Sequence, residues 1–282
     1  MRKSESGILA SLSHDQSAPI PQPGAPRSSG GVHVVLDDGV AVITIDRPQA
    51  RNAIGFATIS ELDAALDRVL TSAAAVVVVR GGGDRAFVSG GDLKELSAIR
   101  THEDAVGMAS RVRRLLDRLA GFPVPVVAAL NGHALGGGAE VAIAADVRIA
   151  ADDVKIGFNQ VSLGIMPAWG GAEQLAQVIG RGRALLAIAT GRLYDAPAAL
   201  QLGLVDLVVP RSSFDHDWRT LARELADSAP GTTRALKSVI GAAVPSCHPE
   251  LEADATDAFA QLWMADAHWA AVDALEQKRR TG

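Results

Sequence analysis

The stretch that decides the fold is NGHALGGGAE, residues 131–140. It follows the apolar run 124–130, typical of a buried strand, and precedes the apolar run 141–145, typical of a buried helix. Three glycines at a strand-to-helix turn let the backbone approach a bulky group closely, with free N–H groups facing it. Glu140 then falls in the first helical turn, near the positive end of the helix dipole. This layout suits the formation and quenching of an enolate; the alternative is a glycine-rich packing turn with a dipole-complementing glutamate.

Composition narrows the class of protein. The chain has 282 residues, of which 48% are hydrophobic and 21% charged, as in a soluble globular protein. Its net charge of −5, without a basic run, gives no support to nucleic-acid binding. A single cysteine, Cys247, excludes an internal disulfide and a multi-cysteine metal site. No apolar run reaches the roughly 18 residues of a membrane span, and no secretory signal is recognisable, so we expect a cytoplasmic protein without a membrane partner.

The sequence predicts three regions. Residues 1–31 are rich in Ser, Pro and Gly, which cannot bury enough apolar surface to offset their ordering entropy, so a disordered tail is expected. Residues 32–210 contain strand–strand–helix units at irregular spacing, which predicts an α/β fold with a wound, repeating core. Residues 211–282 form the expected helical C-terminal region. The apolar side of its amphipathic segment 250–280 packs either on the parent domain or on a neighbouring subunit, and we favour oligomerisation.

Local patterns place the first elements. Asp37-Asp38-Gly39 between two apolar runs predicts a hairpin. Residues 58–61, TISE, fit a capping box at a helix start. The apolar face of that helix is predicted to comprise Ile59, Leu62, Leu66, Val69 and Leu70.

Several enzyme classes lack their sequence signatures here. There is no G-x-S-x-G elbow and no Walker-A pattern, so a hydrolase serine and nucleotide hydrolysis are unsupported. The glycines at 136–138 follow a strand, but the dinucleotide-binding pattern G-x-G-x-x-G/A is broken at Val141. The only tyrosine, Tyr194, has Ala198 four positions later, which removes the Tyr-x-x-x-Lys pair of short-chain dehydrogenases. The seven histidines show no metal-ligand spacing. The sequence therefore indicates neither a dehydrogenase nor a metalloenzyme.

Four segments, in order and at matching spacing, resemble the enoyl-CoA hydratase/isomerase (crotonase) family over about residues 32–280. They are IDRP with NA at 45–48 and 52–53, AFVSGGDL at 86–93, NGHALGGGAE at 131–140 and GIMPAWGG at 164–171. The resemblance implies a crotonase-type spiral of repeated strand–strand–helix units with a helical C-terminal region. It also implies an acyl-CoA thioester as substrate, a homotrimer or a dimer of trimers, and no metal or other cofactor, since coenzyme A arrives with the substrate.

The same resemblance implies roles for individual residues. The backbone N–H groups of Gly91 and Gly137 match the oxyanion hole that polarises a thioester carbonyl. Glu140 matches one of two carboxylates that activate and orient water. The second carboxylate position, seven residues before Pro167, holds Gln160, whose carboxamide does not titrate near neutral pH. Gln160 is nevertheless a catalytic candidate, because an amide holds a water or donates a hydrogen bond to a substrate oxygen.

The remaining candidates each have two interpretations. Lys94 and Arg51 each either meet the phosphates of coenzyme A or are solvated surface charges. Trp169 shapes the pocket wall or packs under the loop, and Asp92 binds substrate or caps a helix. His133 is a core histidine or touches the acyl pocket. Together, the predicted substrate-binding residues are Ala53, Asp92, Leu93, Lys94 and Trp169.

Gln160 leaves several functions open. We expect first an enoyl-CoA hydratase-like lyase that acts through a thioester enolate. A decarboxylase of a branched malonyl-CoA, of the methylmalonyl or ethylmalonyl type, is the second interpretation. The segments GGGAE at 136–140 and PAWGG at 167–171 also resemble those of ethylmalonyl-CoA decarboxylase-like members, which lack the second carboxylate. Loss of CO₂ generates the enolate directly. An enoyl-CoA isomerase and a non-catalytic acyl-CoA-binding subunit are the others. Acyl chain length and branching are not encoded in any pattern that we recognise.

Overall fold

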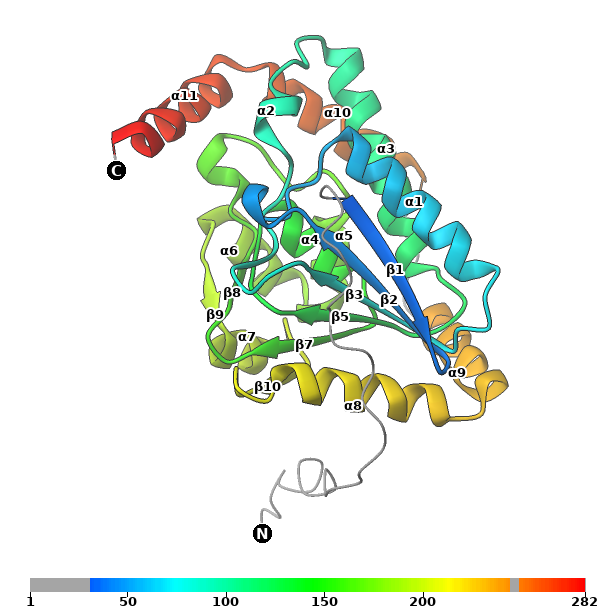
Figure 1. Ribbon diagram of the computed structural model, residues 1–282. Coiled ribbons are helices and arrows are strands. Elements are labelled where there is room, and N and C mark those ends of the chain that lie inside the picture. Colours follow the sequence, from blue (N-terminus) through cyan, green and yellow to red (C-terminus); the bar gives the residue numbers. More distant parts are fainter. Residues whose placement is uncertain (1–30, 244–248, 282) are drawn as a thin grey trace.

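Two β-sheets form the centre of the computed structural model, which describes residues 31–243 and 249–281 (Figure 1). The predicted tail therefore lies outside the described residues, except for its last position. The larger sheet has the order β1-β2-β3-β5-β7-β10, and the smaller has β4-β6-β8-β9. The larger sheet comprises β1 Gly31–Asp37, β2 Val40–Asp46, β3 Val76–Gly81, β5 Val126–Leu130, β7 Val147–Ala151 and β10 Leu207–Val209. The smaller comprises β4 Ala86–Val88, β6 His133–Leu135, β8 Lys155–Gly157 and β9 Tyr194–Asp195.

Each repeat of the spiral contributes one strand to each sheet. The strands β3, β5 and β7 run parallel in the larger sheet, and the strand that follows each of them, β4, β6 or β8, runs parallel in the smaller one. A helical segment then leads to the next repeat. These segments are α2 Leu93–Leu96 with α3 His102–Ala120, α4 Gly137–Ile143, and the 3-10 turn η3 Gln160–Leu163 with α5 Gly171–Ile179. The predicted α/β fold with strand–strand–helix units is confirmed.

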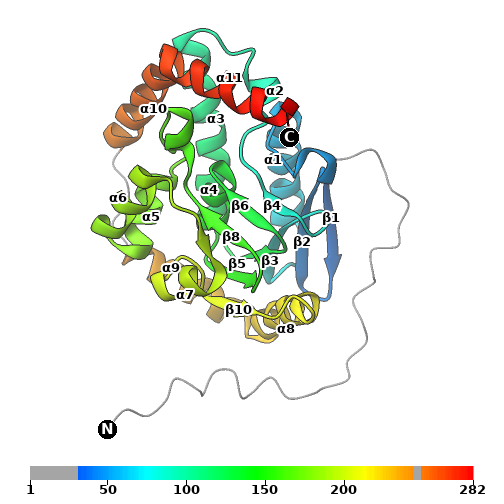
Figure 2. The same ribbon diagram turned by 90° about the vertical axis from the view of Figure 1, so that its left-hand side faces the viewer.

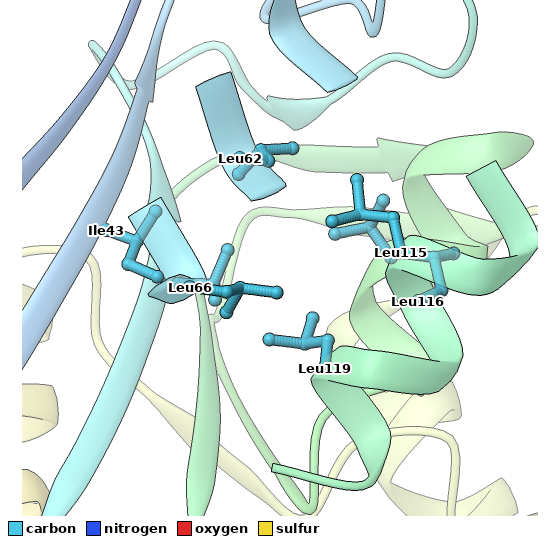
Figure 3. A pocket seen from close by; sticks show the side chains of 8 residues that line it. Ile43, Leu62, Leu66, Leu115, Leu116 and Leu119 are labelled. Carbon is cyan, nitrogen blue, oxygen red and sulfur yellow. The ribbon is translucent and has the colours of Figure 1, made fainter. Parts of the chain in front are cut away.

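The central strands are buried because helices pack against the sheet. All residues of β5 are buried, as are the four valines 76–79 of β3, which fits the continuous apolar runs of parallel strands. Helix α1 Phe56–Leu70 packs on β1 and β2, and α8 Phe214–Asp227 contacts β2, β3 and β7. A small apolar cavity of about 20 Å³ remains among α1, α3, α4 and the larger sheet (Figure 3). Its lining includes Ile43, Leu62, Leu66, Leu115, Leu116 and Leu119.

The hairpin is confirmed, whereas the predicted start of α1 is wrong. The strands β1 and β2 pair antiparallel on either side of Asp38-Gly39. Helix α1 begins at Phe56, and Thr58 is a buried residue of its first turn instead of the cap. The carboxylate of Glu95 accepts the Phe56 N–H at 2.8 Å, so a distant side chain replaces the local capping box. Leu70 is also exposed, because it lies at the last position of the helix.

The C-terminal part of the chain is helical after β10. After α8 it comprises α9 Pro230–Ala242, α10 Pro249–Met264 and α11 Asp266–Thr281. The elements not yet named lie before β10: the 3-10 turn η2 Pro48–Ala50, α6 Arg181–Thr190 and α7 Ala196–Leu202. Helix α10 packs on α3, and both α10 and α11 lie at the same end of the molecule as α2 (Figures 1 and 2). Part of segment 250–280 therefore packs on its own core, through α10 on α3 and α11 on η3. Within the described ranges, no helix has the length and apolarity needed to cross a membrane.

Candidate active site

Glu140 lies in the first turn of α4 with only 2% of its surface exposed. Its Oε1 accepts a hydrogen bond from Gln160 Nε2 at 2.9 Å. Its Oε2 accepts from the backbone N–H groups of Trp169 at 2.8 Å and Gly171 at 3.0 Å. Burial raises the pKa of Glu140 to about 7, although these three hydrogen bonds favour the carboxylate. A fixed carboxyl group with a near-neutral pKa is suited to both accepting and donating a proton at pH 7.

Gln160 is the first residue of η3 and is 8% exposed. Its Nε2 donates to Glu140, whereas its buried Oε1 has no hydrogen-bond partner among the described residues. The Gly136 backbone lies against this side chain, since a Cβ added at Gly136 would lie 3.8 Å from Gln160 Cδ. Gln160 therefore fixes one carboxylate oxygen and leaves an acceptor available for a ligand or a water.

The backbone at Gly91 presents an unpaired N–H group. Ile54 N–H donates to Gly90 O at 2.8 Å, and Asp92 N–H donates to Ile54 O at 2.9 Å. Because successive residues of an extended strand point their N–H groups to opposite sides, the Gly91 N–H points away from Ile54. No described residue accepts a hydrogen bond from it.

A second unpaired N–H group lies at the start of α4. The Gly136 N–H donates to Gly157 O at 2.9 Å, whereas no described residue accepts from Gly137, the first residue of the helix. A Cβ added at Gly90 would lie 3.4 Å from the Gly137 nitrogen, so the two glycine segments are in contact. Together, two unpaired backbone donors lie on adjacent segments near Glu140.

The glycines at the start of α4 make room for protein atoms. A Cβ at Gly137 would overlap the Trp169 ring, and a Cβ at Gly138 would overlap the Val88 carbonyl oxygen. A Cβ at Gly91 would lie 3.7 Å from the same indole ring. Trp169 is buried, and its ring lies against both glycines whose N–H groups are unpaired.

Asp92 is confirmed as a helix cap. Its Oδ1 accepts the Lys94 N–H at 3.3 Å at the start of α2, and its Oδ2 accepts from Arg47 Nη2 at 2.9 Å. Arg47 Nη1 also donates to the carbonyl of buried Ala53 at 2.6 Å. Arg47 therefore joins two predicted substrate-binding residues, and sequence reasoning did not single it out although it lies within the quoted IDRP motif.

The other predicted residues lie nearer the surface. Leu93 is half-buried, whereas Lys94 and Arg51 are exposed. His133 is exposed, and its Nδ1 accepts the Lys155 N–H at 3.1 Å, so the prediction of a core histidine is wrong. In residues 31–243 and 249–281, no group of three or more His, Cys, Asp or Glu side chains is arranged to hold a metal ion.

The fold and these contacts define a spiral α/β protein with a buried glutamate of near-neutral pKa beside unpaired backbone donors. The model of the enoyl-CoA hydratase/isomerase family matches residues 36–279, and the chain belongs to this family. It is an enzyme of the enoyl-CoA hydratase-like type, as predicted.

Relatives and solved structures agree with this assignment. The chain is 33% identical over 244 residues to the short-chain-enoyl-CoA hydratase of Clostridium acetobutylicum, covering 86% of this chain and 92% of that protein. It is similar to the crystal structure of an enoyl-CoA hydratase from Bacillus anthracis, with a TM-score of 0.73, 31% identity, and coverage of 88% and 96%. Carnitinyl-CoA hydratase from Mycobacterium avium gives a TM-score of 0.77 at 29% identity, with coverage of 89% and 97%.

Proposed function

We propose that the protein adds water across the double bond of a 2-enoyl-CoA thioester. Glu140 carries the proposal, because it combines burial, a pKa of about 7 and a position beside two unpaired backbone donors. The N–H groups of Gly91 and Gly137 would bind the thioester oxygen as negative charge develops on it. Removing one such donor typically costs about 2.7–4 kcal/mol of transition-state stabilisation.

In the proposed reaction, the Glu140 carboxylate takes a proton from water as the water oxygen bonds to C3. The electron pair of the C2=C3 bond moves onto C2 and the thioester oxygen, giving an enolate held by the two N–H groups. Glu140 then returns the proton to C2. Because Gln160 does not titrate, Glu140 serves as both base and acid.

Gln160 would orient the components of this reaction. Its Nε2 holds Glu140 Oε1 at 2.9 Å, and its unpartnered Oε1 would accept the second hydrogen of the attacking water. With Glu140 transferring the proton and Gln160 orienting the water, hydration would proceed without a second carboxylate. Ala53, Leu93, Lys94 and Trp169 remain the proposed substrate-binding residues, whereas Asp92 caps α2 and pairs with Arg47.

The proposal needs no metal and no cofactor besides the coenzyme A carried by the substrate. We also propose a cytoplasmic homotrimer or dimer of trimers. Exposed apolar side chains on two separate helices support the oligomer, since they include Leu185 on α6 and Ile240 on α9.

Decarboxylation of a branched malonyl-CoA is the second candidate. Gln160 favours it, because breaking the carbon–carbon bond to CO₂ leaves its electron pair as the enolate without a base. Protonated Glu140 would then supply the only proton, at the α-carbon. The same two backbone N–H groups would hold the thioester oxygen.

Product analysis by mass spectrometry distinguishes the two candidates. The purified protein is incubated separately with short and medium 2-enoyl-CoAs and with methylmalonyl- and ethylmalonyl-CoA. A mass gain of one water on an enoyl-CoA supports hydration. Loss of CO₂ with the enoyl-CoAs unchanged overturns hydration and supports the second candidate. Tight thioester binding without any mass change overturns both, and leaves a mass-neutral enoyl-CoA isomerase or an acyl-CoA-binding subunit.

A further inference from the structure

Four aromatic residues cluster at the junction of α10 and α11. We call this cluster the aromatic corner and define it as Phe259, Trp263, His268 and Trp269. The His268 ring lies 4.5 Å from the Trp263 ring and 4.7 Å from the Trp269 ring, centroid to centroid. Phe259 extends the stack at 5.5 Å from Trp263. Trp263 and His268 are almost completely buried. The corner is therefore a packed unit rather than a flexible end of the chain.

The aromatic corner donates hydrogen bonds to two segments next to the candidate site, the residues just after α2 and the turn η3. Trp263 Nε1 donates to the Ile99 carbonyl at 3.3 Å, just after α2. Within α2, Leu96 packs so close to Gly91 that a Cβ at Gly91 would lie 2.5 Å from its Cδ1. On the other side, His268 Nδ1 lies 2.7 Å from the carbonyl oxygen of Leu163. The corner thus connects the Gly91 side of the site with η3.

The contact of His268 bears most directly on the chemistry. Leu163 is the last residue of η3, the turn that begins with Gln160. The end of this turn also contacts the backbone of α11, since a Cβ added at Gly164 would lie 3.4 Å from the backbone nitrogen of His268. Gln160 in turn holds Glu140 Oε1. Two hydrogen bonds at opposite ends of η3, His268 to Leu163 and Gln160 to Glu140, therefore connect the aromatic corner to the Glu140 carboxyl group.

The imidazole of His268 is suited to a fixed role. Because its partner is a carbonyl oxygen, Nδ1 carries the hydrogen, and the buried Nε2 has no partner among the described residues. Burial lowers the pKa of His268, with a smaller contribution from the charge of Arg100, whose guanidinium lies 3.5 Å above the Trp269 ring. The ring therefore stays neutral and donates through Nδ1 at neutral pH.

We propose that His268 is a positioning residue, which holds η3 so that Gln160 keeps Glu140 Oε1 in its productive orientation. The inference rests on the proposed acid–base role of Glu140 and goes beyond it, because it makes the C-terminal helices part of the catalytic geometry. His268 touches no reacting atom in this proposal. It acts through the Leu163 carbonyl and Gln160.

Two substitutions separate the hydrogen bond from the ring packing. His268→Phe keeps an aromatic ring and removes the donor, whereas His268→Asn keeps an N–H donor near the position of Nδ1. With an enoyl-CoA substrate, we expect His268→Phe to lower kcat by about 10- to 100-fold, because a small displacement of a catalytic group has an effect of that size. KM should change little, and His268→Asn should recover most of the lost kcat. Equal losses in the two variants would contradict a role for the hydrogen bond.

A double-mutant cycle tests whether His268 acts through Gln160. In the Gln160→Ala background, His268→Phe should reduce kcat by less than about twofold, because the group it positions is already gone. The same fold-loss in both backgrounds would overturn the proposal. Val272→Ala is the matched control, since Val272 is buried on α11. It should lower the thermal midpoint while leaving kcat nearly unchanged.

Hydrogen–deuterium exchange gives a readout that does not depend on turnover. The amides of residues 160–165 should exchange faster in His268→Phe than in wild type, and should be unaffected in Val272→Ala. Unchanged exchange in His268→Phe contradicts the positioning role. If wild type turns over no acyl-CoA, the proposed function fails, and the exchange result alone then decides whether His268 holds η3.

Discussion

At the scale of single residues, Glu140 makes stability depend on pH. Its pKa rises from 4.5 to about 7 on folding, so the folded state binds this proton more tightly than the unfolded state. The resulting stabilisation is fully present below pH 4.5 and is lost as pH rises through about 7. At about 1.4 kcal/mol per pH unit, the loss amounts to about 3 kcal/mol.

Glu140→Gln isolates this effect. The free energy of unfolding of wild type, minus that of the variant, should decrease between pH 5 and pH 8, because the amide does not titrate. Urea denaturation at the two pH values measures both free energies, and all other titrating groups cancel in the difference. A difference that stays constant or grows with pH would contradict a raised pKa for Glu140.

The same carboxyl group should govern turnover. Glu140→Gln is expected to lower kcat by about 10²- to 10⁴-fold with little change in KM, since it removes the proton acceptor. In wild type, hydration should increase as pH rises through about 7, because the base must be ionised. Glu173→Gln is the control, since the Glu173 charge raises the pKa of Glu140. That variant should retain turnover and move the pH midpoint downward, as shown by initial rates from pH 5 to 9.

Gln160→Glu should move the pH midpoint in the opposite direction. It would replace the donor 2.9 Å from Glu140 Oε1 by a second carboxyl group, and like charges at this distance raise the pKa of one of the pair. We expect the alkaline plateau of kcat to begin at higher pH than in wild type. An unchanged pH profile would show that Gln160 does not contact Glu140 in the working enzyme.

At the scale of elements, the start of α4 depends on glycine for steric reasons. Gly138→Ala should destabilise the fold by more than about 2 kcal/mol, because the new Cβ would overlap the Val88 carbonyl oxygen of β4. Gly107→Ala in α3 is the matched control, since a Cβ there meets nothing within 4 Å. It should stabilise the protein by about 0.5–1 kcal/mol through helix propensity. Thermal denaturation distinguishes the two, and equal effects would contradict the packing argument.

Helices and strands could be predicted where neighbouring residues in the sequence determine them. Apolar periodicity and the 131–140 motif predicted β5, α4 and the repeating units, because strand burial and glycine turns leave short-range patterns. The start of α1 was missed, since its first N–H is held by Glu95 from another repeat. For the same reason the contacts of Arg47 with Asp92 and of His268 with Leu163 could not be predicted. They join residues that are 45 and 105 positions apart.

At the scale of the whole molecule, exposed apolar side chains argue for assembly. Leu185 on α6 is 66% exposed, and Val239 and Ile240 on α9 are 70% and 65% exposed. A closed ring requires two different surfaces on each subunit, because each interface joins unlike patches. Apolar faces on α6 and α9 meet this requirement, whereas a two-fold dimer needs only one self-complementary patch.

If these faces form the proposed oligomer, a charge in either one should weaken it, because a buried unpaired carboxylate is strongly unfavourable. Leu185→Glu and Ile240→Glu should each shift the sedimenting species from trimer or hexamer toward monomer at micromolar concentration. Leu70→Glu is the matched control, since Leu70 is 52% exposed at the end of α1 and belongs to neither α6 nor α9. It should leave the sedimentation coefficient unchanged. A monomeric wild type would contradict the proposed assembly, and an effect of Leu70→Glu alone would place the interface on α1 instead.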